Sequence, residues 1–286
     1  MKAKLDCYSC FLRVGLQTAR MAGASEAKQC ELMAEFLDVL KTSMDNESPL
    51  AAVHRIQRIV CRETGVTDPY RDVKDKCDAE ASRWLPHLQD EVAAAPAPLH
   101  AALKVAAIGN IMDYGAFANF DVGSLIERLH HSDFAIDASA EFTRRLDRAR
   151  TVSYIADNAG EVVFDTVLIT RLLDHHGIDT VRLVIRDTPF LNDVSCDAHL
   201  PDSLLHHPKV EILRLSVVSA QRDPDVWQSV TGSDIVISKG MANFENYSEQ
   251  PGFFFLLIAK CDLVSSLIAK RTGTDVTTGD WIFLHG

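Results

Sequence analysis

The later two thirds of this 286-residue sequence alternate between short β-rich runs and helical patterns. Helical patterns over Ser139–Ala149 and Val162–His175 separate some of the runs, and Gly279–Leu284 is a candidate edge strand. Alternation of this kind produces βαβ units, with parallel strands and helices on both faces of the sheet. We therefore predict an α/β fold with a mainly parallel sheet flanked by helices, in a Rossmann-like three-layer arrangement. The candidate strands are Phe134–Asp137, Val152–Asp157, Val181–Arg186, Val210–Leu215, Asp234–Ser238 and Gly252–Ala259.

The first ninety or so residues carry helical patterns and no strand signal. One helix is expected from Pro49 to Gly65, because proline suits a first helical turn and glycine a helix end. Another pattern runs from about Asp72 to Ala94, and the Ala/Pro-rich stretch Ala93–Pro98 then reads as a linker. We predict an all-helical N-terminal region at residues 1–95, a candidate cap, and an α/β domain at residues 96–286.

The net charge and the apolar runs of the sequence indicate which kinds of binding partner to expect. The formal net charge of -11 argues against a general nucleic-acid binder, which would normally carry a basic patch. No apolar run approaches the length of a membrane span, and the first residues lack an apolar signal-peptide core. We therefore expect a cytoplasmic protein without a membrane or nucleic-acid partner, and the sequence leaves its oligomeric state open. Its seven cysteines are expected to be reduced thiols.

A polar segment, Asp157-Asn158-Ala159-Gly160-Glu161, directly follows a candidate buried strand and precedes a candidate helix. In an open α/β sheet, ligands bind just past the carboxyl ends of the strands. Asp157 and Asn158 offer the oxygen ligands that suit magnesium or manganese. Backbone N–H groups near Gly160 suit an anion, as helix N-termini often do. These residue types also form ordinary turns, so the segment alone leaves both interpretations open.

Three further polar clusters strengthen the first interpretation. Two of them also follow predicted strands, so the fold would bring them to the same edge of the sheet as Asp157. Simpler interpretations remain for two residues, since Asp193 could cap a helix that begins at Val194 and Lys239 could lie in a surface turn. The clusters are Gly109-Asn110 with Asp113, Asn192-Asp193, and Lys239-Gly240 with Asn243 and Glu245.

Together with Cys7-Tyr-Ser-Cys10, Asp68-Pro69-Tyr70 with Lys74, and Lys260-Cys261, these clusters span nearly the whole chain in order. In them the chain resembles the damage-control phosphatase family, long catalogued as domain-of-unknown-function family 89. It is most similar to the branch whose members carry an N-terminal Cys-x-x-Cys.

The resemblance implies a metal-dependent phosphatase that hydrolyses small phosphorylated metabolites, such as sugar phosphates, in metabolite damage control. A divalent ion, Mg²⁺, Mn²⁺, Co²⁺ or Ni²⁺, would be held by Asp157, Asn158 and Asp193. The residues implied to take part in catalysis are Asp157, Asn158, Lys239 and Asp113. The residues implied to bind or line the phosphate and substrate are Asn110, Gly160, Glu161, Lys239, Gly240 and Asn243.

This assignment agrees with the chemistry of phosphoryl transfer, which depends on neutralising charge and placing the attacking group in line. A divalent ion would cancel the charge of its carboxylate ligands and so reconcile an acidic chain with an anionic substrate. The attacking group would be either a water molecule or a carboxylate such as Asp157 or Asp113, and the sequence leaves both open.

Two other functions have weaker support in the sequence. An S-adenosylmethionine-dependent carboxyl methyltransferase activity has been attributed to a relative of the family, but the chain lacks a G-x-G loop after an early strand. A non-enzymatic metal- or nucleotide-binding module would not need Lys239 beside paired acids. Cys7 and Cys10 could form half of a zinc site with Cys30, Cys61 or Cys77, although buried or pocket-facing thiols are the simpler interpretation.

Overall fold

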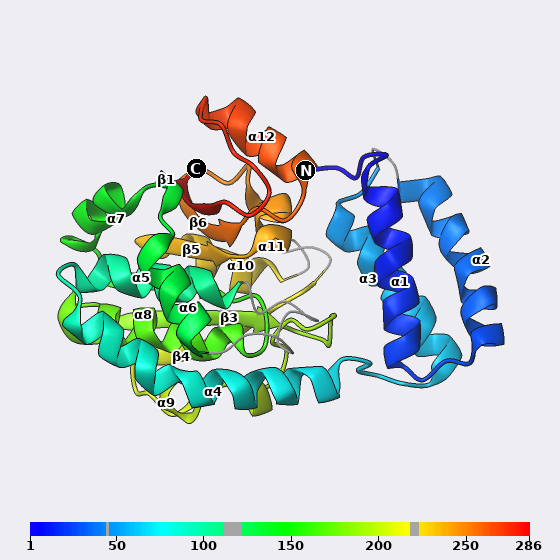
Figure 1. Cartoon of the computed structure of the whole chain (residues 1–286), viewed down its shortest axis with the longest axis horizontal. Helices are drawn as coiled ribbons and strands as arrows, with labels where there is room; N and C mark the ends of the chain where they lie inside the picture. Colours follow the sequence, from blue (N-terminus) through cyan, green and yellow to red (C-terminus); the bar gives the residue numbers. More distant parts are fainter. Residues whose placement is uncertain (44–45, 111–121, 218–222) are drawn as a thin grey trace.

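The computed structural model describes residues 1–43, 46–110, 122–217 and 223–286, with the backbone alone at residues 122–125. Within these ranges, helices cover a seven-stranded sheet, and three further helices form a bundle beside it (Figure 1). The helices before the first strand are α1 (Cys7–Met21), α2 (Glu26–Ser43), α3 (Pro49–Thr64), α4 (Arg71–Ala94), α5 (Pro98–Gly109) and α6 (Val122–His131).

The strands match the predicted runs to within two residues at each end. They are β1 (Phe134–Asp137), β2 (Thr151–Ile155), β3 (Thr180–Arg186), β4 (Val210–Leu215), β5 (Ile235–Lys239), β6 (Phe253–Ile258) and β7 (Trp281–His285). Between them lie α7 (Ser139–Leu146), α8 (Glu161–His175), the short 3₁₀ helix η2 (Asp197–His199), α9 (Asp202–Leu205), α10 (Pro224–Thr231), α11 (Met241–Tyr247) and α12 (Asp262–Thr272).

The helices α1, α2 and α3 pack into a bundle with its own apolar core, which includes Phe11, Leu32 and Phe36. Helix α3 begins at Pro49 and ends at Gly65 in a left-handed conformation, as predicted. The bundle core also takes in Phe190 and Val217, which lie in the loops after β3 and β4. The bundle therefore rests against the carboxyl ends of the strands.

Helix α4 belongs to a different layer from the bundle. Its buried residues Ala81, Trp84, Leu88 and Val92 share one apolar core with the strands and with α5 and α8. Figure 1 shows α4 running from the bundle along the helical layer of the sheet. The all-helical N-terminal region thus has two parts, and the division of the chain at residue 95 remains a prediction.

The sheet has the strand order β1-β7-β6-β5-β2-β3-β4. Strands β2 to β6 are parallel, whereas β7 is antiparallel to β6 and parallel to β1. The predicted edge position of the last strand is wrong, because β7 lies between β1 and β6. Its residues Ile282 and Phe283 are fully buried on opposite faces, so helices cover both faces of the sheet at β7.

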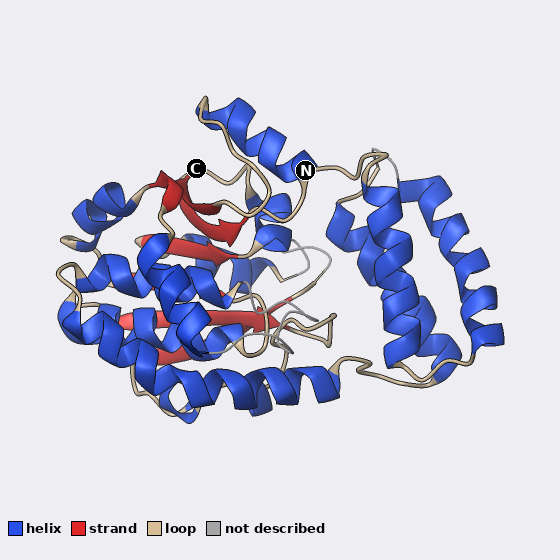
Figure 2. Cartoon of the chain, in the orientation of Figure 1, coloured by secondary structure: helices blue, strands red, loops and turns tan. Residues whose placement is uncertain are grey.

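The two faces of the sheet carry alternate side chains, as expected for strands. Tyr154 packs with α4, α5 and α8, whereas its neighbour Ile155 packs with α10, α11 and α12. Figure 2 shows the strands enclosed between these helices. The predicted three-layer α/β arrangement with a helical N-terminal region is confirmed. No helix in the described ranges is long and apolar enough to cross a membrane.

The strand order reverses between β2 and β5. The chain proceeds from β2 outward to β3 and β4, and then returns to place β5 on the other side of β2. At such a switch point the loops after the two neighbouring strands leave in opposite directions and form a crevice that binds ligands. The segment after β2 begins with Ala156 and Asp157, and the one after β5 begins with Gly240.

Candidate active site at the switch point of the sheet

The loops after β2 and β5 approach each other very closely at the switch point. Gly240 has a positive φ of 77°, and a Cβ atom placed on it would lie 1.9 Å from Asp157 Oδ2. Only glycine therefore leaves room for the Asp157 carboxylate beside this turn. The predicted convergence of the Asp157 and Lys239-Gly240 clusters at one edge of the sheet is observed.

Two amide side chains join the carboxylates of Asp157 and Glu161. Asn110 Nδ2 donates to Asp157 Oδ2 at 3.0 Å and to Glu161 Oε2 at 3.1 Å. Asn158 Nδ2 donates to the same two oxygen atoms at 3.0 and 3.1 Å. All four side chains are buried. The predicted site residues Asn110, Asp157, Asn158 and Glu161 thus form one hydrogen-bonded group.

The Asp157 carboxyl group lies where negative charge is poorly compensated. Burial raises its pKa well above the usual value, and the charges of Glu161 and Asp193 raise it further, against the opposing effects of Lys260 and Arg186. A pKa raised in this way means that the buried group is costly to ionise without an additional positive charge. The site therefore has the electrostatics of a cation-binding site.

Asp193 reaches this group from the loop after β3. A β-bridge joins Asn158 to Asp193, and the N–H of Val194 donates to the carbonyl oxygen of Asp157 at 2.9 Å. No helix begins at Val194, so the interpretation of Asp193 as a simple helix cap is wrong. Arg186 Nε donates to Asp193 Oδ2 at 2.7 Å, and both side chains are buried.

Lys239 is completely buried, so its interpretation as a surface turn residue is also wrong. Its ammonium group donates to Glu161 Oε1 at 2.7 Å, to Asp165 Oδ1 at 2.5 Å and to the carbonyl oxygen of Ala106 at 2.9 Å. Burial alone would lower the pKa of Lys239, but Asp165 and Glu161 outweigh it and the pKa is raised. Lys239 thus supplies a permanent positive charge beneath Glu161, and a direct contact with phosphate remains a prediction.

Asp165 extends the same group toward the core. Tyr154 Oη donates to Asp165 Oδ1 at 2.7 Å, and the tyrosine is fully buried. Burial raises the pKa of Asp165 to about 6 even though Lys239 lowers it. One lysine is therefore shared between two buried acids.

Asn243 braces the site from α11. Its Nδ2 donates to the carbonyl oxygens of Ala156 and Lys239 at 3.0 and 2.8 Å, and its Oδ1 accepts from Arg186 Nη2 at 2.8 Å. The predicted role of Asn243 in lining the substrate pocket is not tested by these contacts. They give it a positioning role between the two strand ends and Arg186.

Gly160 is held from a distant part of the chain. Its N–H, which the sequence suggested as an anion donor, instead donates to Asp78 Oδ1 of α4 at 2.6 Å. The other oxygen of Asp78 lies 2.6 Å from His199 Nδ1. Gly160 has a φ of 78°, and a Cβ atom on it would lie 2.8 Å from Cys77 Cβ. Helix α4 therefore fixes the loop that carries Asp157.

The donor set fits a hard divalent cation. Both hydrogen bonds to the Asp157 carboxylate go to Oδ2, and Asn158 donates through its nitrogen, so the described residues leave the Oδ1 oxygens of both side chains for a cation. Oxygen ligands of this kind suit Mg²⁺ or Mn²⁺. A site built from three or more His, Cys, Asp or Glu side chains is absent from the described residues.

The remaining predicted residues do not join this group. Asp113 lies outside the described residues. All seven cysteines are free thiols, with Cys7 half-buried and Cys10 exposed. The alternative of a closed zinc site at Cys7 and Cys10 therefore finds no support in the part of the chain that is described.

Several residues of the site were missed by the sequence analysis. A signal existed for Arg186, because a charged residue ends an otherwise apolar strand, and for Asp165, because it interrupts an apolar helix. Lys260, which the sequence offers only as part of the family resemblance, directly follows the apolar run of β6, and its charge acts on Asp157. Asp78 and His199 had no comparable signal, because each lies in a polar stretch of the sequence, although His199 is buried in the structure.

A family model described as the damage-control phosphatase ARMT1-like domain matches residues 3–276. The chain belongs to the damage-control phosphatase family. The resemblance found from the sequence is confirmed. Family membership makes the chain a phosphatase of metabolite repair.

Known proteins of the family match the chain along nearly its whole length. A damage-control phosphatase from Archaeoglobus fulgidus is 29% identical over 96% of this chain and 97% of its own length. One from Pyrococcus horikoshii is 26% identical over 93% of each. The crystal structure of a family-89 protein from Pyrococcus horikoshii superposes with a TM-score of 0.83 and 25% identity, covering 100% of this chain and 99% of that one.

Proposed function

We propose that this phosphatase is metal-dependent and hydrolyses small phosphorylated metabolites such as sugar phosphates. The observation that carries the proposal is the group formed by Asp157, Asn158 and Asp193 at the switch point. Burial raises the pKa of Asp157 well above its usual value there, and the carboxylates of Glu161 and Asp193 raise it further. A divalent cation would remove this excess of negative charge and create a binding site for a phosphate group.

The ion would be held by oxygen atoms of Asp157, Asn158 and Asp193, and we propose Mg²⁺, Mn²⁺, Co²⁺ or Ni²⁺ as candidates. When bound, such an ion supplies Lewis-acid stabilisation of the phosphoryl group and lowers the pKa of a bound water molecule. Arg186 already donates to Asp193 Oδ2 at 2.7 Å, which fixes the orientation of that carboxylate. Hydrogen bonds from neighbouring residues to metal-binding side chains orient those side chains at metal sites.

The other residues would position and neutralise charge. Lys239 holds Glu161 and Asp165 in place, and Asn110 holds Asp157 against Glu161. Gly240 leaves room for the Asp157 carboxylate beside the turn after β5, where the phosphate would approach. For the attacking group we favour water, because a carboxylate that ligates a cation is a weakened nucleophile. We propose that Asp113 and Asn243 line the pocket.

The test is phosphate release from a panel of sugar phosphates and nucleotides, with each of the four ions and with EDTA. We expect turnover that needs an ion, stops with chelator and falls about a thousandfold in Asp157→Ala, since an interaction with developing charge is lost. Arg62→Gln, on the exposed side of α3, should retain full activity. Unchanged activity in Asp157→Ala, or in EDTA, would refute the assignment.

The location and partners follow the same reasoning. We propose a cytoplasmic enzyme whose partner is the phosphorylated metabolite and which binds neither nucleic acid nor membrane. A methyltransferase is less well supported, because the loop at the switch point presents carboxylates and a single glycine, Gly160, instead of a glycine-rich nucleotide loop. Calorimetry with S-adenosylmethionine would distinguish the two activities.

A further inference from the structure

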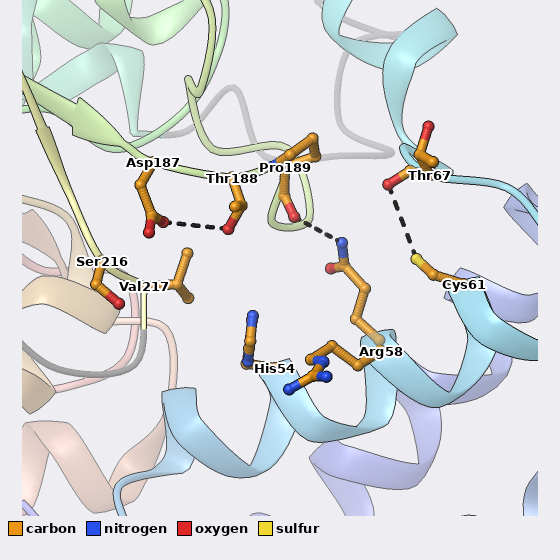
Figure 3. A pocket seen from close by; sticks show the side chains of 10 residues that line it. His54, Arg58, Cys61, Thr67, Asp187, Thr188, Pro189, Ser216 and Val217 are labelled. Carbon is orange, nitrogen blue, oxygen red and sulfur yellow. Dashed lines mark hydrogen bonds between the residues drawn. The ribbon is translucent and has the colours of Figure 1, made fainter. Parts of the chain in front are cut away.

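A cavity of about 380 Å³ lies between the bundle and the sheet. It is within the size range of ligand pockets, roughly 300 to 1,000 Å³. Figure 3 shows His54 and Arg58 of α3 on one side and Asp187 and Thr188, after β3, on the other. Ser216, after β4, completes this second wall. Most of the exposed lining surface is apolar, and polar side chains stand on both walls.

The cavity lies next to the proposed phosphate site. Strand β3 pairs with β2, whose end carries Asp157, and β4 pairs with β3. The cavity, lined by residues that follow β3 and β4, therefore lies on the β3 side of the switch point.

The loop after β3 belongs to both sites. It begins with Asp187 in the wall of the cavity and continues to Asp193. Gln57 of α3 fixes its middle, because Gln57 Nε2 donates to the carbonyl oxygen of Pro189 at 3.0 Å and Gln57 Oε1 accepts from the N–H of Leu191 at 2.8 Å. A ligand in the cavity would therefore be held in a constant position relative to Asp193.

The arginines of α3 differ in whether they form ion pairs with carboxylates of the chain. Arg55 Nη1 lies 2.7 Å from Glu47 Oε1, and Arg62 Nη2 lies 2.6 Å from Glu35 Oε2. For Arg58, which lines the cavity, the described residues provide no carboxylate or hydrogen-bond partner. In a chain of net charge -11, a cation left without a partner beside a cavity is available for an anionic group of a ligand.

The opposite wall would suit the hydroxyl groups of the same ligand. Thr188 Oγ1 donates to Asp187 Oδ1 at 3.1 Å, and the remaining carboxylate oxygen of Asp187 and the hydroxyl of Ser216 can accept hydrogen bonds. A ligand that matches both walls has hydroxyl groups along its chain and an acidic group that reaches Arg58.

We propose that this cavity receives the non-phosphate part of the substrate, and that Arg58 selects phosphorylated polyhydroxy acids over the corresponding uncharged sugar phosphates. This inference rests on the proposed phosphatase activity, because that activity sets the orientation of the substrate. The phosphate would lie at Asp157 and the second acidic group at Arg58. It adds the chemical class of substrate and the residue that distinguishes it.

The test compares 6-phosphogluconate with glucose 6-phosphate, which differ in a carboxylate at the end away from the phosphate. For each, kcat/KM for phosphate release and Kd by calorimetry would be measured in wild type, Arg58→Gln, Arg58→Lys and Arg62→Gln. Arg62 is the matched control, because it is an exposed arginine of the same helix that is paired away from the cavity.

We expect wild type to favour 6-phosphogluconate in both measurements. The preference should fall about tenfold in Arg58→Gln, as for the loss of one charged hydrogen bond. It should be largely retained in Arg58→Lys and unchanged in Arg62→Gln. Phosphate release with a preference that is the same in Arg58→Gln and wild type would overturn this inference and leave the phosphatase proposal intact.

The binding measurement separates the two proposals. If neither compound is hydrolysed under any condition, the proposed reaction fails. A Kd for 6-phosphogluconate that weakens in Arg58→Gln but not in Arg62→Gln would still support the cavity assignment. A Kd that is equal in all variants would overturn it.

Discussion

The bundle and the switch point of the sheet use charge in opposite ways. In the bundle, ion pairs such as Arg62–Glu35 lie on the surface, with side chains that are 60% and 40% exposed. At the switch point, the pairs Lys239–Glu161 and Arg186–Asp193 are almost completely removed from solvent. Surface pairs contribute little to stability, whereas buried charges are costly and persist where a function needs them. The contrast marks the switch point as the functional part of the molecule.

The comparison between surface and buried ion pairs predicts its largest effect, a loss of stability, for Lys239→Met. The variant leaves Glu161 and Asp165 buried without their shared cation, which should lower the free energy of unfolding by about 3 to 5 kcal/mol. Arg62→Met, in the bundle, should leave the unfolding curve almost unchanged. Urea denaturation of both variants checks this, and equal losses would remove the distinction between the two regions.

Gly240→Ala should have the next largest effect, on activity. The added Cβ atom would lie 1.9 Å from Asp157 Oδ2 and must displace that carboxylate. Misplacing a reacting group by an ångström can cost about a hundredfold in rate, and we expect a loss of that size. The control is Gly23→Ala in the bundle, where φ is also positive at 72° but a Cβ atom meets no described atom within 4 Å. Similar activity in both variants would argue against a tight approach at Asp157.

Glu245 is a buried acid at the boundary between the two regions, and its pKa makes the stability of the protein depend on pH. Burial raises its pKa to about 7 from 4.5, against a lowering by the N-terminal amino group. The folded state therefore holds this proton more tightly, so the contribution of Glu245 to stability is complete below pH 4.5 and is lost as the pH rises through about 7.

Glu245→Gln removes this titration. The variant should match wild type near pH 4.5 and exceed its free energy of unfolding by about 3 kcal/mol at pH 8. Urea denaturation across this pH range measures the difference. A difference that does not change with pH would show that Glu245 is already ionised in the folded protein.

A smaller effect is expected at Asp78, which connects α4 to the loop of the site. Asp78→Asn keeps an acceptor for the N–H of Gly160 but can no longer accept from His199 with its other atom. Loss of such an outer contact should raise the metal concentration for half-maximal activity about tenfold. The exposed Asp90→Asn on the same helix is the control. An unchanged metal dependence in Asp78→Asn would limit the role of Asp78 to folding.

The sequence predicted the layers of the fold well because each strand is a compact apolar run. It failed for the position of β7, Trp281–His285, which was expected at an edge of the sheet. Strand β7 lies between β1 and β6 because β1 takes the edge of the sheet. Which strand takes the edge depends on the pairing of all the strands. Local patterns carry no such information.

For the site, the sequence located residues that share a position relative to their strands. Asp157 and Lys239 lie at or just after strand ends, so parallel pairing alone brings them together. The residues that contact these side chains and their loops were not predictable in this way. Asp165 lies a full turn into α8, and Asp78 reaches Gly160 across 82 positions of the chain. Such pairs are fixed by the packing of helices against the sheet.

The central claim is that Asp157 and Asp193 form a site for a divalent cation. Calorimetric titration of Mn²⁺ into wild type, Asp157→Ala and Asp193→Ala tests it without any substrate. We predict saturable binding at one site in wild type, loss of that binding in both variants, and retention in Arg62→Gln. Binding to Asp157→Ala with wild-type affinity would contradict the account.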